Sequence, residues 1–135
     1  MGKGIISREI KNEADEIYDN VGAVFYNVNE FDDTYFYSLP NGMSGKFRFL
    51  RNVTNNTFSL VNLTENKVKI EYVRENNNAT LLVNAFTIID EQGIKYVFND
   101  FSQNYEEERS NNLIAKLCKL AFFLSKIVDT NNNDI

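Results

Sequence analysis

The sequence predicts a protein of the α+β class that is mainly β: a small antiparallel β-barrel of five to seven strands with a helix near each end. Between residues 23 and 100, apolar residues recur at every second position in short runs. Only a few Asn, Asp, Gly or Pro residues separate these runs, which leaves no room for the crossovers that parallel strands need. Residues 7–21 and 104–128 show helical spacing of apolar residues instead.

The strand pattern is informative in residues 46–53. Side chains of an extended strand point alternately to opposite faces, so Phe47 and Phe49 share one face, and Lys46 and Arg48 share the other. We therefore expect the phenylalanines in the core and the cations outside. Strands are predicted at residues 23–28, 34–39, 46–53, 57–63, 67–73, 80–89 and 94–98.

Each predicted helix has residues suited to its ends. Ser7 can cap the N-terminal helix, and Asn104 with Glu107 forms a capping pair for the long C-terminal helix. The apolar face of the second helix is wide enough to pack on a sheet. Its stripe consists of Leu113, Leu117, Leu120 and Leu124.

Length and composition predict one domain over residues 1–128. The chain has 135 residues, 43% of them hydrophobic and 24% charged, as in ordinary globular proteins. The polar residues 129–135 are predicted to be a disordered tail. Because no apolar run approaches the roughly 18 residues of a membrane span and no secretory segment is visible, we expect a cytoplasmic protein without membrane contact. The single cysteine, Cys118, fits a reducing compartment.

The sequence carries no motif for catalysis. It contains no histidine, which removes the commonest general base and a common metal ligand. Neither a P-loop nor a dinucleotide-binding glycine pattern is present, and Cys118 lies on an apolar face, where an inert thiol is expected. We therefore predict a protein that is not an enzyme, with no catalytic residue, metal or cofactor.

Positive charge is concentrated in the middle of an otherwise acidic chain. The net charge is −5, but residues 41–74 hold six basic and two acidic residues. A basic track combined with aromatic faces is the usual means of holding single-stranded nucleic acid. Tyr35 and Tyr37 share a strand face and can stack on bases, although a half-buried cross-strand pair explains them as well. The predicted nucleic-acid-binding residues are Lys46, Arg48, Arg51, Lys67, Lys69, Tyr35 and Tyr37.

Two stretches carry a family resemblance. Residues 37–42 lead into a basic strand, and residues 85–102 combine an apolar strand, an acidic turn with Gly93, a strand with Tyr96 and a following serine. In these features the chain resembles phage-type single-stranded-DNA-binding proteins of the OB-fold. The resemblance implies an OB-like barrel and binding of single-stranded nucleic acid in a phage or plasmid system.

Two alternatives remain open. The acidic residues 9–19 and 106–108 are also compatible with a protein-binding inhibitor, immunity or anti-defence protein that uses an acidic surface. Seven strands followed by a helix resemble pleckstrin-homology-like barrels, although the acidic residues 30–33 disfavour a phosphoinositide site there. The oligomeric state does not follow from the sequence.

Overall fold

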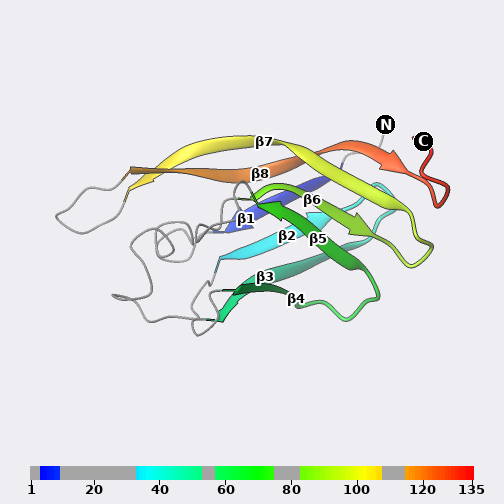
Figure 1. Cartoon of the computed structure of the whole chain (residues 1–135), viewed down its shortest axis with the longest axis horizontal. Coiled ribbons are helices and arrows are strands. Elements are labelled where there is room, and N and C mark those ends of the chain that lie inside the picture. The colour runs from blue at the N-terminus through cyan, green and yellow to red at the C-terminus, as the bar shows by residue number, and fades with distance from the viewer. Residues whose placement is uncertain (1–3, 10–32, 53–56, 75–82, 108–114) are drawn as a thin grey trace.

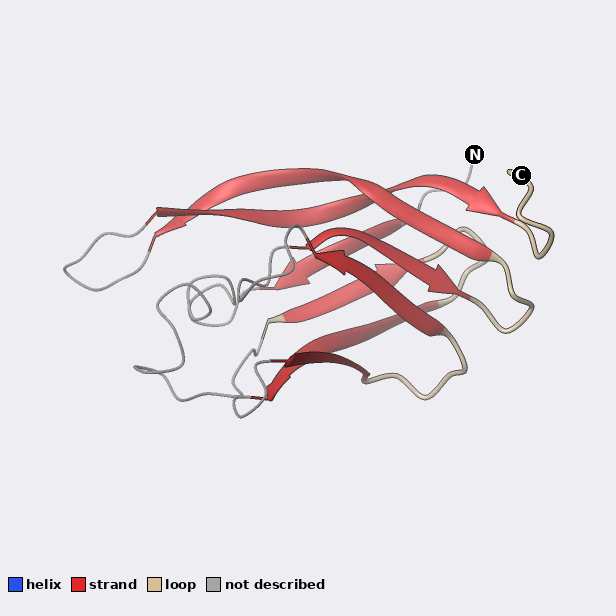
Figure 2. Cartoon of the chain, in the orientation of Figure 1, coloured by secondary structure: helices blue, strands red, loops and turns tan. Residues whose placement is uncertain are grey.

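All regular secondary structure that the structure describes is β-strand. The computed structural model describes residues 4–9, 33–52, 57–74, 83–107 and 115–135, and these contain eight strands and no helix (Figure 2). The strands are β1 (Ile5–Glu9), β2 (Thr34–Ser38), β3 (Ser44–Asn52), β4 (Thr57–Asn62), β5 (Lys69–Arg74), β6 (Val83–Ile89), β7 (Lys95–Glu107) and β8 (Ala115–Val128).

The strands form one antiparallel sheet that curls into a nearly closed barrel (Figure 1). Their order is β4-β3-β2-β1-β8-β7-β6-β5, so most neighbours in the sheet are also neighbours in the chain. The exception is the ladder between β1 and β8, which joins the two halves of the chain. Within the described residues, no ladder joins β4 to β5, the two ends of the sheet order, so the barrel is open between them.

The predicted α+β class is therefore wrong, as are the OB-like and pleckstrin-homology-like barrels of five to seven strands with two helices. Of the predicted N-terminal helix, Ser7–Glu9 lie in β1, and residues 10–21 lie outside the described residues. Of the predicted C-terminal helix, the described residues belong to β7 and β8.

Irregular pairing explains why β8 resembles a helix in the sequence. The β7–β8 ladder passes over Asn99 in β7 and over Leu120 and Ser125 in β8, so each of these is an extra residue in a bulge. An extra residue reverses the alternation of side chains, and two residues three positions apart then face the same way. Leu124 and Ile127 both pack on the core in this manner.

The other strand predictions agree with the structure in position. The runs at 34–39, 46–53, 57–63, 67–73 and 80–89 correspond to β2 through β6, and the run at 94–98 is the start of the longer β7. The predicted strand at 23–28 lies outside the described residues. Phe47 and Phe49 are fully buried, which confirms their predicted place in the core.

Aromatic rings fill the interior of the barrel. Tyr35 stacks on Phe47 with ring centroids 5.1 Å apart, and Phe86 packs edge-on against Phe47 at 5.2 Å. Phe86 also contacts Phe122 of β8 at 4.9 Å, so the cluster spans the barrel from β2 to β8. Because the interior is filled, we expect binding sites on the outer surface and at the open edge.

The C-terminal residues form a turn rather than the predicted disordered tail. The Asp129 carboxylate accepts hydrogen bonds from the backbone N–H groups of Asn131 and Asn133, both at 2.9 Å. The Ile135 N–H then donates to the carbonyl of Ile127 at 2.8 Å. Asp and Asn favour this turn because their side chains satisfy the local backbone.

Candidate functional site

Two cations of β3, Lys46 and Arg48, lie on the outer face of the barrel, as predicted. Lys46 is exposed and Arg48 is half-buried, on the face opposite to Phe47 and Phe49. In the β2–β3 ladder, Lys46 lies directly opposite Phe36, whose side chain is 41% exposed. We call the outer surface of Phe36, Lys46 and Arg48 the basic face.

A shallow hollow adjoins the basic face. Phe36, Lys46 and Gly45 line it together with Thr64, and its volume is about 390 Å³. The Lys46 N–H donates a hydrogen bond to Oγ1 of Thr64 at 2.9 Å, and this bond holds the loop after β4 next to Lys46. These contacts hold the backbone of Lys46 and leave its ammonium group at the surface.

The predicted basic track needs β3 and β5 to be adjacent strands, and in the described sheet they are not. Lys67 lies in the loop between β4 and β5 and Lys69 lies in β5, and both are exposed. In the sheet, β5 is separated from β3 by β4 and by the opening of the barrel. The Lys69 ammonium lies 3.4 Å from the Glu71 carboxylate, in an ion pair with both side chains exposed. Arg51 lies in β3 opposite Phe58 of β4. Lys46 and Arg48 are therefore the two predicted cations that we assign to the basic face.

The predicted tyrosines lie in the core. Tyr35 and Tyr37 are 3% and 2% exposed, so neither ring offers a face for base stacking. Tyr35 stacks on Phe47, and the Tyr37 hydroxyl accepts a hydrogen bond from the Asn66 amide at 2.7 Å. Both tyrosines do share one face, as the alternation predicts, but it is the inner face.

Phe36, an exposed aromatic residue beside Lys46, is not among the residues that the sequence predicts to bind nucleic acid. Its signal is present in the turn at residues 40–42. If the two strands pair outward from this turn, Tyr37 lies opposite Gly45 and Tyr35 lies opposite Phe47. Side chains that lie directly opposite each other in a ladder point to the same face of the sheet. Because Phe47 points into the core, Tyr35 must also point inward, and its neighbour Phe36 must point outward.

Two buried carboxylates have structural partners. The Arg8 guanidinium lies 2.6 Å from the Asp33 carboxylate, and both side chains are almost fully buried. Asp90 accepts hydrogen bonds from the N–H groups of Gln92 and Ile94 and from the Tyr96 hydroxyl. Among the described residues, no three His, Cys, Asp or Glu side chains are placed to hold a metal ion together.

Comparisons with protein families, curated proteins and solved structures found no match to this chain. The resemblance to phage single-stranded-DNA-binding proteins therefore stays a prediction from the sequence. In the part of the chain that the structure describes, no helix has the length and apolar character needed to cross a membrane.

Proposed function

We propose that this protein is not an enzyme and binds single-stranded nucleic acid on its basic face. The observation that supports this is the exposed Phe36 directly opposite the exposed Lys46, with Arg48 on the same face of β3. Bases stack on exposed aromatic rings, and neighbouring cations hold the phosphates. Phe36 takes the stacking role that the sequence analysis gave to Tyr35 and Tyr37.

Charge determines how tight this binding can be. The chain is acidic, but exposed charges farther away than a Debye length of about 8–10 Å are largely screened. With two cations on the basic face, about two phosphates are neutralised. The logarithm of the binding constant should then fall with the logarithm of salt concentration with a slope near −1.4. We expect weak binding that is strongest at low salt.

Fluorescence anisotropy with a labelled single-stranded oligonucleotide at several salt concentrations tests the proposal. Lys46→Gln should reduce the salt slope by about 0.7, because one phosphate contact is lost. Phe36→Ala should weaken binding by about 1–3 kcal/mol with little change in slope, because it removes stacking and no charge. Lys126→Gln, which changes an exposed lysine of β8, is the matched control and should leave binding unchanged.

Two results would contradict the proposal. One is the absence of binding to any single-stranded oligonucleotide at low salt. The other is an equal loss of affinity in the Lys46 and Lys126 variants, which would indicate attraction to charge in general and no defined site. We also propose, as part of the same function, that the protein is cytoplasmic and comes from a phage or plasmid.

Protein binding is the second candidate function. The acidic residues predicted to carry it lie mostly outside the described residues. A different feature now favours it, the edge between β4 and β5, which carries no ladder in the part of the chain that the structure describes. Unpaired strand edges are common sites of peptide recognition.

A further inference from the structure

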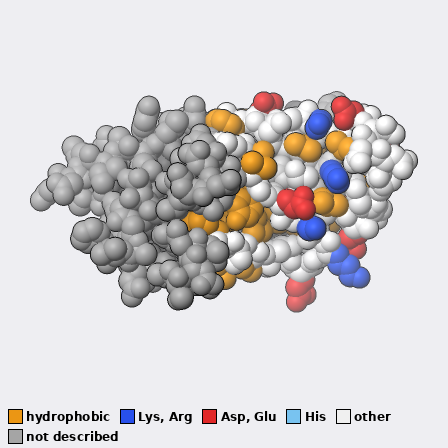
Figure 3. All heavy atoms as spheres, in the orientation of Figure 1, with side chains coloured by type: hydrophobic (Ala, Val, Ile, Leu, Met, Phe, Trp, Pro, Cys, Tyr) orange, Lys and Arg blue, Asp and Glu red, His pale blue; other side chains and the backbone are white. Residues whose placement is uncertain are grey.

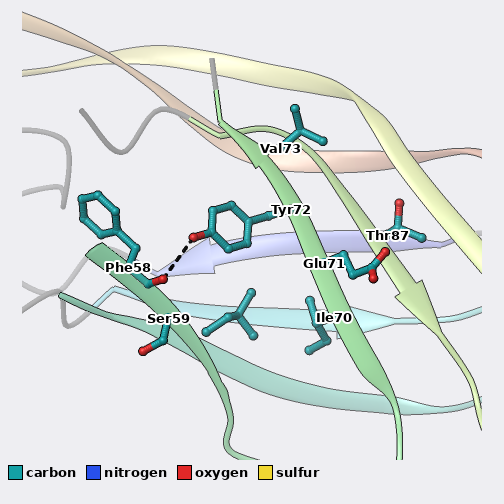
Figure 4. Close-up of a pocket in the computed structure, with 8 residues that line it drawn as sticks. Phe58, Ser59, Ile70, Glu71, Tyr72, Val73 and Thr87 are labelled. Carbon is teal, nitrogen blue, oxygen red and sulfur yellow. Dashed lines mark hydrogen bonds between the residues drawn. The ribbon is translucent and has the colours of Figure 1, made fainter. Parts of the chain in front are cut away.

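The opening of the barrel lies between two strands whose backbones form no ladder with each other in the described residues. Tyr72 of β5 extends across it, and its hydroxyl donates to the carbonyl of Phe58 in β4 at 3.4 Å (Figure 4). A side chain therefore spans the opening at a place where neighbouring strands of a closed barrel would bond through their backbones, about 4.7–4.9 Å apart.

The register of β4 shows which of its backbone groups face the opening. The Leu63 N–H donates to the Lys46 carbonyl, so these two residues form a hydrogen-bonded pair. Hydrogen-bonded and non-hydrogen-bonded pairs alternate along an antiparallel ladder. Because Leu60 and Phe49 lie three pairs further along, they form a non-hydrogen-bonded pair. The N–H and C=O of Leu60 point away from β3 and into the opening. The Phe58 carbonyl, two residues earlier, points the same way and is the group that Tyr72 reaches.

The same reasoning applies to β5. The Asp90 N–H donates to the Ile94 carbonyl, so at this position β6 directs its backbone groups toward the strand that follows it. Ile88 lies two residues before Asp90 and directs its groups the same way. Its partner Ile70 in β5 therefore has its N–H and C=O on the side away from β6. These groups also point into the opening.

A groove follows the opening, with a volume of about 580 Å³. Leu60, Ile70 and Tyr72 form apolar parts of its lining, and all three pack against the core of the barrel. Glu71 is the charged residue of the lining that the structure describes, and its side chain is half exposed. The Lys69 ammonium lies 3.4 Å from this carboxylate, and basic and acidic side chains lie next to each other on the face that Figure 3 shows. The groove thus combines backbone donors and acceptors, an apolar floor and, at its rim, the Glu71 carboxylate beside Lys69.

We propose that this groove binds an extended segment of a partner protein as an added strand. The segment forms backbone hydrogen bonds with Leu60 and Ile70, as in other cases of strand addition. Its alternate side chains are apolar toward the floor and polar toward solvent. Charge complementarity with Glu71, which also lies beside Lys69, assigns one Lys or Arg to the solvent-facing position of the segment next to Glu71.

The topology also determines the direction of the added strand. Seven antiparallel ladders separate β4 from β5 in the sheet order, so these two strands run in opposite directions. A strand between them is antiparallel to one and parallel to the other. Strand addition here completes the barrel and is independent of the basic face.

A labelled peptide of alternating lysine and valine, titrated into the full-length protein and followed by fluorescence anisotropy, is the direct test. We expect saturable binding. Methylation of the backbone amides on one edge of the peptide should weaken binding about tenfold or more, because several backbone hydrogen bonds are lost together. Glu71→Gln should weaken it about twofold to fivefold, as expected for an exposed ion pair.

The Tyr72→Phe variant should bind the peptide more tightly than the unmodified protein does. It keeps the ring on Phe49, 4.9 Å away, and removes the hydrogen bond that crosses the opening. Peptide affinity should rise about twofold to tenfold, because that bond no longer has to break. Tyr96→Phe is the matched control, since this hydroxyl binds Asp90. Lys46→Gln separates the two sites: it should leave peptide binding unchanged, whatever it does to the oligonucleotide.

Three outcomes would overturn the inference. The first is equal binding of the methylated and unmethylated peptides, which would show that the backbone edge is not used. The second is no peptide binding to either the unmodified protein or the Tyr72→Phe variant. The third is a concentration-dependent dimer in light scattering that the peptide dissociates, which would identify the occupant as a second copy of this chain.

Discussion

Single polar residues determine how the barrel turns are built, and Asp90 is the clearest case. Its buried carboxylate accepts two backbone N–H groups of the β6–β7 turn and the hydroxyl of Tyr96 at 3.2 Å. Burial, and then the charge and hydrogen bond of Asp90, raise the pKa of Tyr96 above its ordinary value of 10.0. The native state therefore holds the Tyr96 proton more tightly than the unfolded chain does.

This pKa shift predicts a loss of stability in alkali. A raised pKa stabilises the native state below pH 10, and the contribution disappears as the pH rises through and above that value. Urea unfolding between pH 8 and 11 should show this loss. Tyr96→Phe should lower stability at pH 8 by about 1.5–3 kcal/mol, because a hydrogen bond to a charged group is removed. The stability of the variant should also fall less steeply above pH 10 than that of the unmodified protein. Parallel curves of stability against pH for the two proteins would contradict the raised pKa of Tyr96.

The alternation of side chains along a strand predicts correctly which face a residue of β3 occupies. The examples are Phe47 and Phe49 on the inner face and Lys46 and Arg48 on the outer face. Their faces follow from the two-residue period of a strand, and the structure agrees. The same period assigns Tyr35 and Tyr37 to one face without saying which. The inner face was decided by the register with β3, where Tyr35 lies opposite Phe47.

At the scale of elements, β2 and β3 approach closely at Gly45. A Cβ atom at this position would lie 2.6 Å from Cζ of Tyr37 and 2.8 Å from Oγ1 of Thr64. These distances are too short for ordinary contact, so glycine is needed here for space. The hydroxyl of Tyr37, held by Asn66, occupies the room that a larger residue would take.

Gly45→Ala should therefore destabilise the protein. We expect a loss of about 1–3 kcal/mol in the free energy of unfolding, because an added methyl group displaces a well-packed ring. Ser44→Ala, at the exposed neighbouring position, is the control and should change stability by less than about 0.5 kcal/mol. Denaturant unfolding measures both, and equal stabilities of the two variants would show that Tyr37 moves aside at no cost.

At the scale of the molecule, the ladder between β1 and β8 connects the two halves of the barrel. In the described residues, β1–β4 form one continuous antiparallel run and β5–β8 another, and no ladder joins β4 to β5. Ile6 lies at this connection, fully buried, opposite Tyr37 on one side and Phe122 on the other. Its side chain therefore contributes to the packing of both halves.

Ile6→Ala should weaken the whole barrel. Loss of a fully buried isoleucine costs about 2–5 kcal/mol, and one cooperative transition is expected because both halves share the core. Ile5→Ala, which changes the partly exposed neighbour on the outer face, should cost much less. Unfolding followed by tyrosine fluorescence and by far-UV circular dichroism should coincide. Two separate transitions would contradict a shared core.

The sequence by itself determined the short-range features: most strand positions, the core place of Phe47 and Phe49, and the outward direction of Lys46 and Arg48. These depend on the two-residue period of an extended chain, which is a local steric property. Tertiary structure decided β8, the burial of Tyr35 and Tyr37, the separation of β5 with Lys69 from β3, and the open edge. Each of these depends on the register and bulges of ladders between distant segments, which local alternation does not encode.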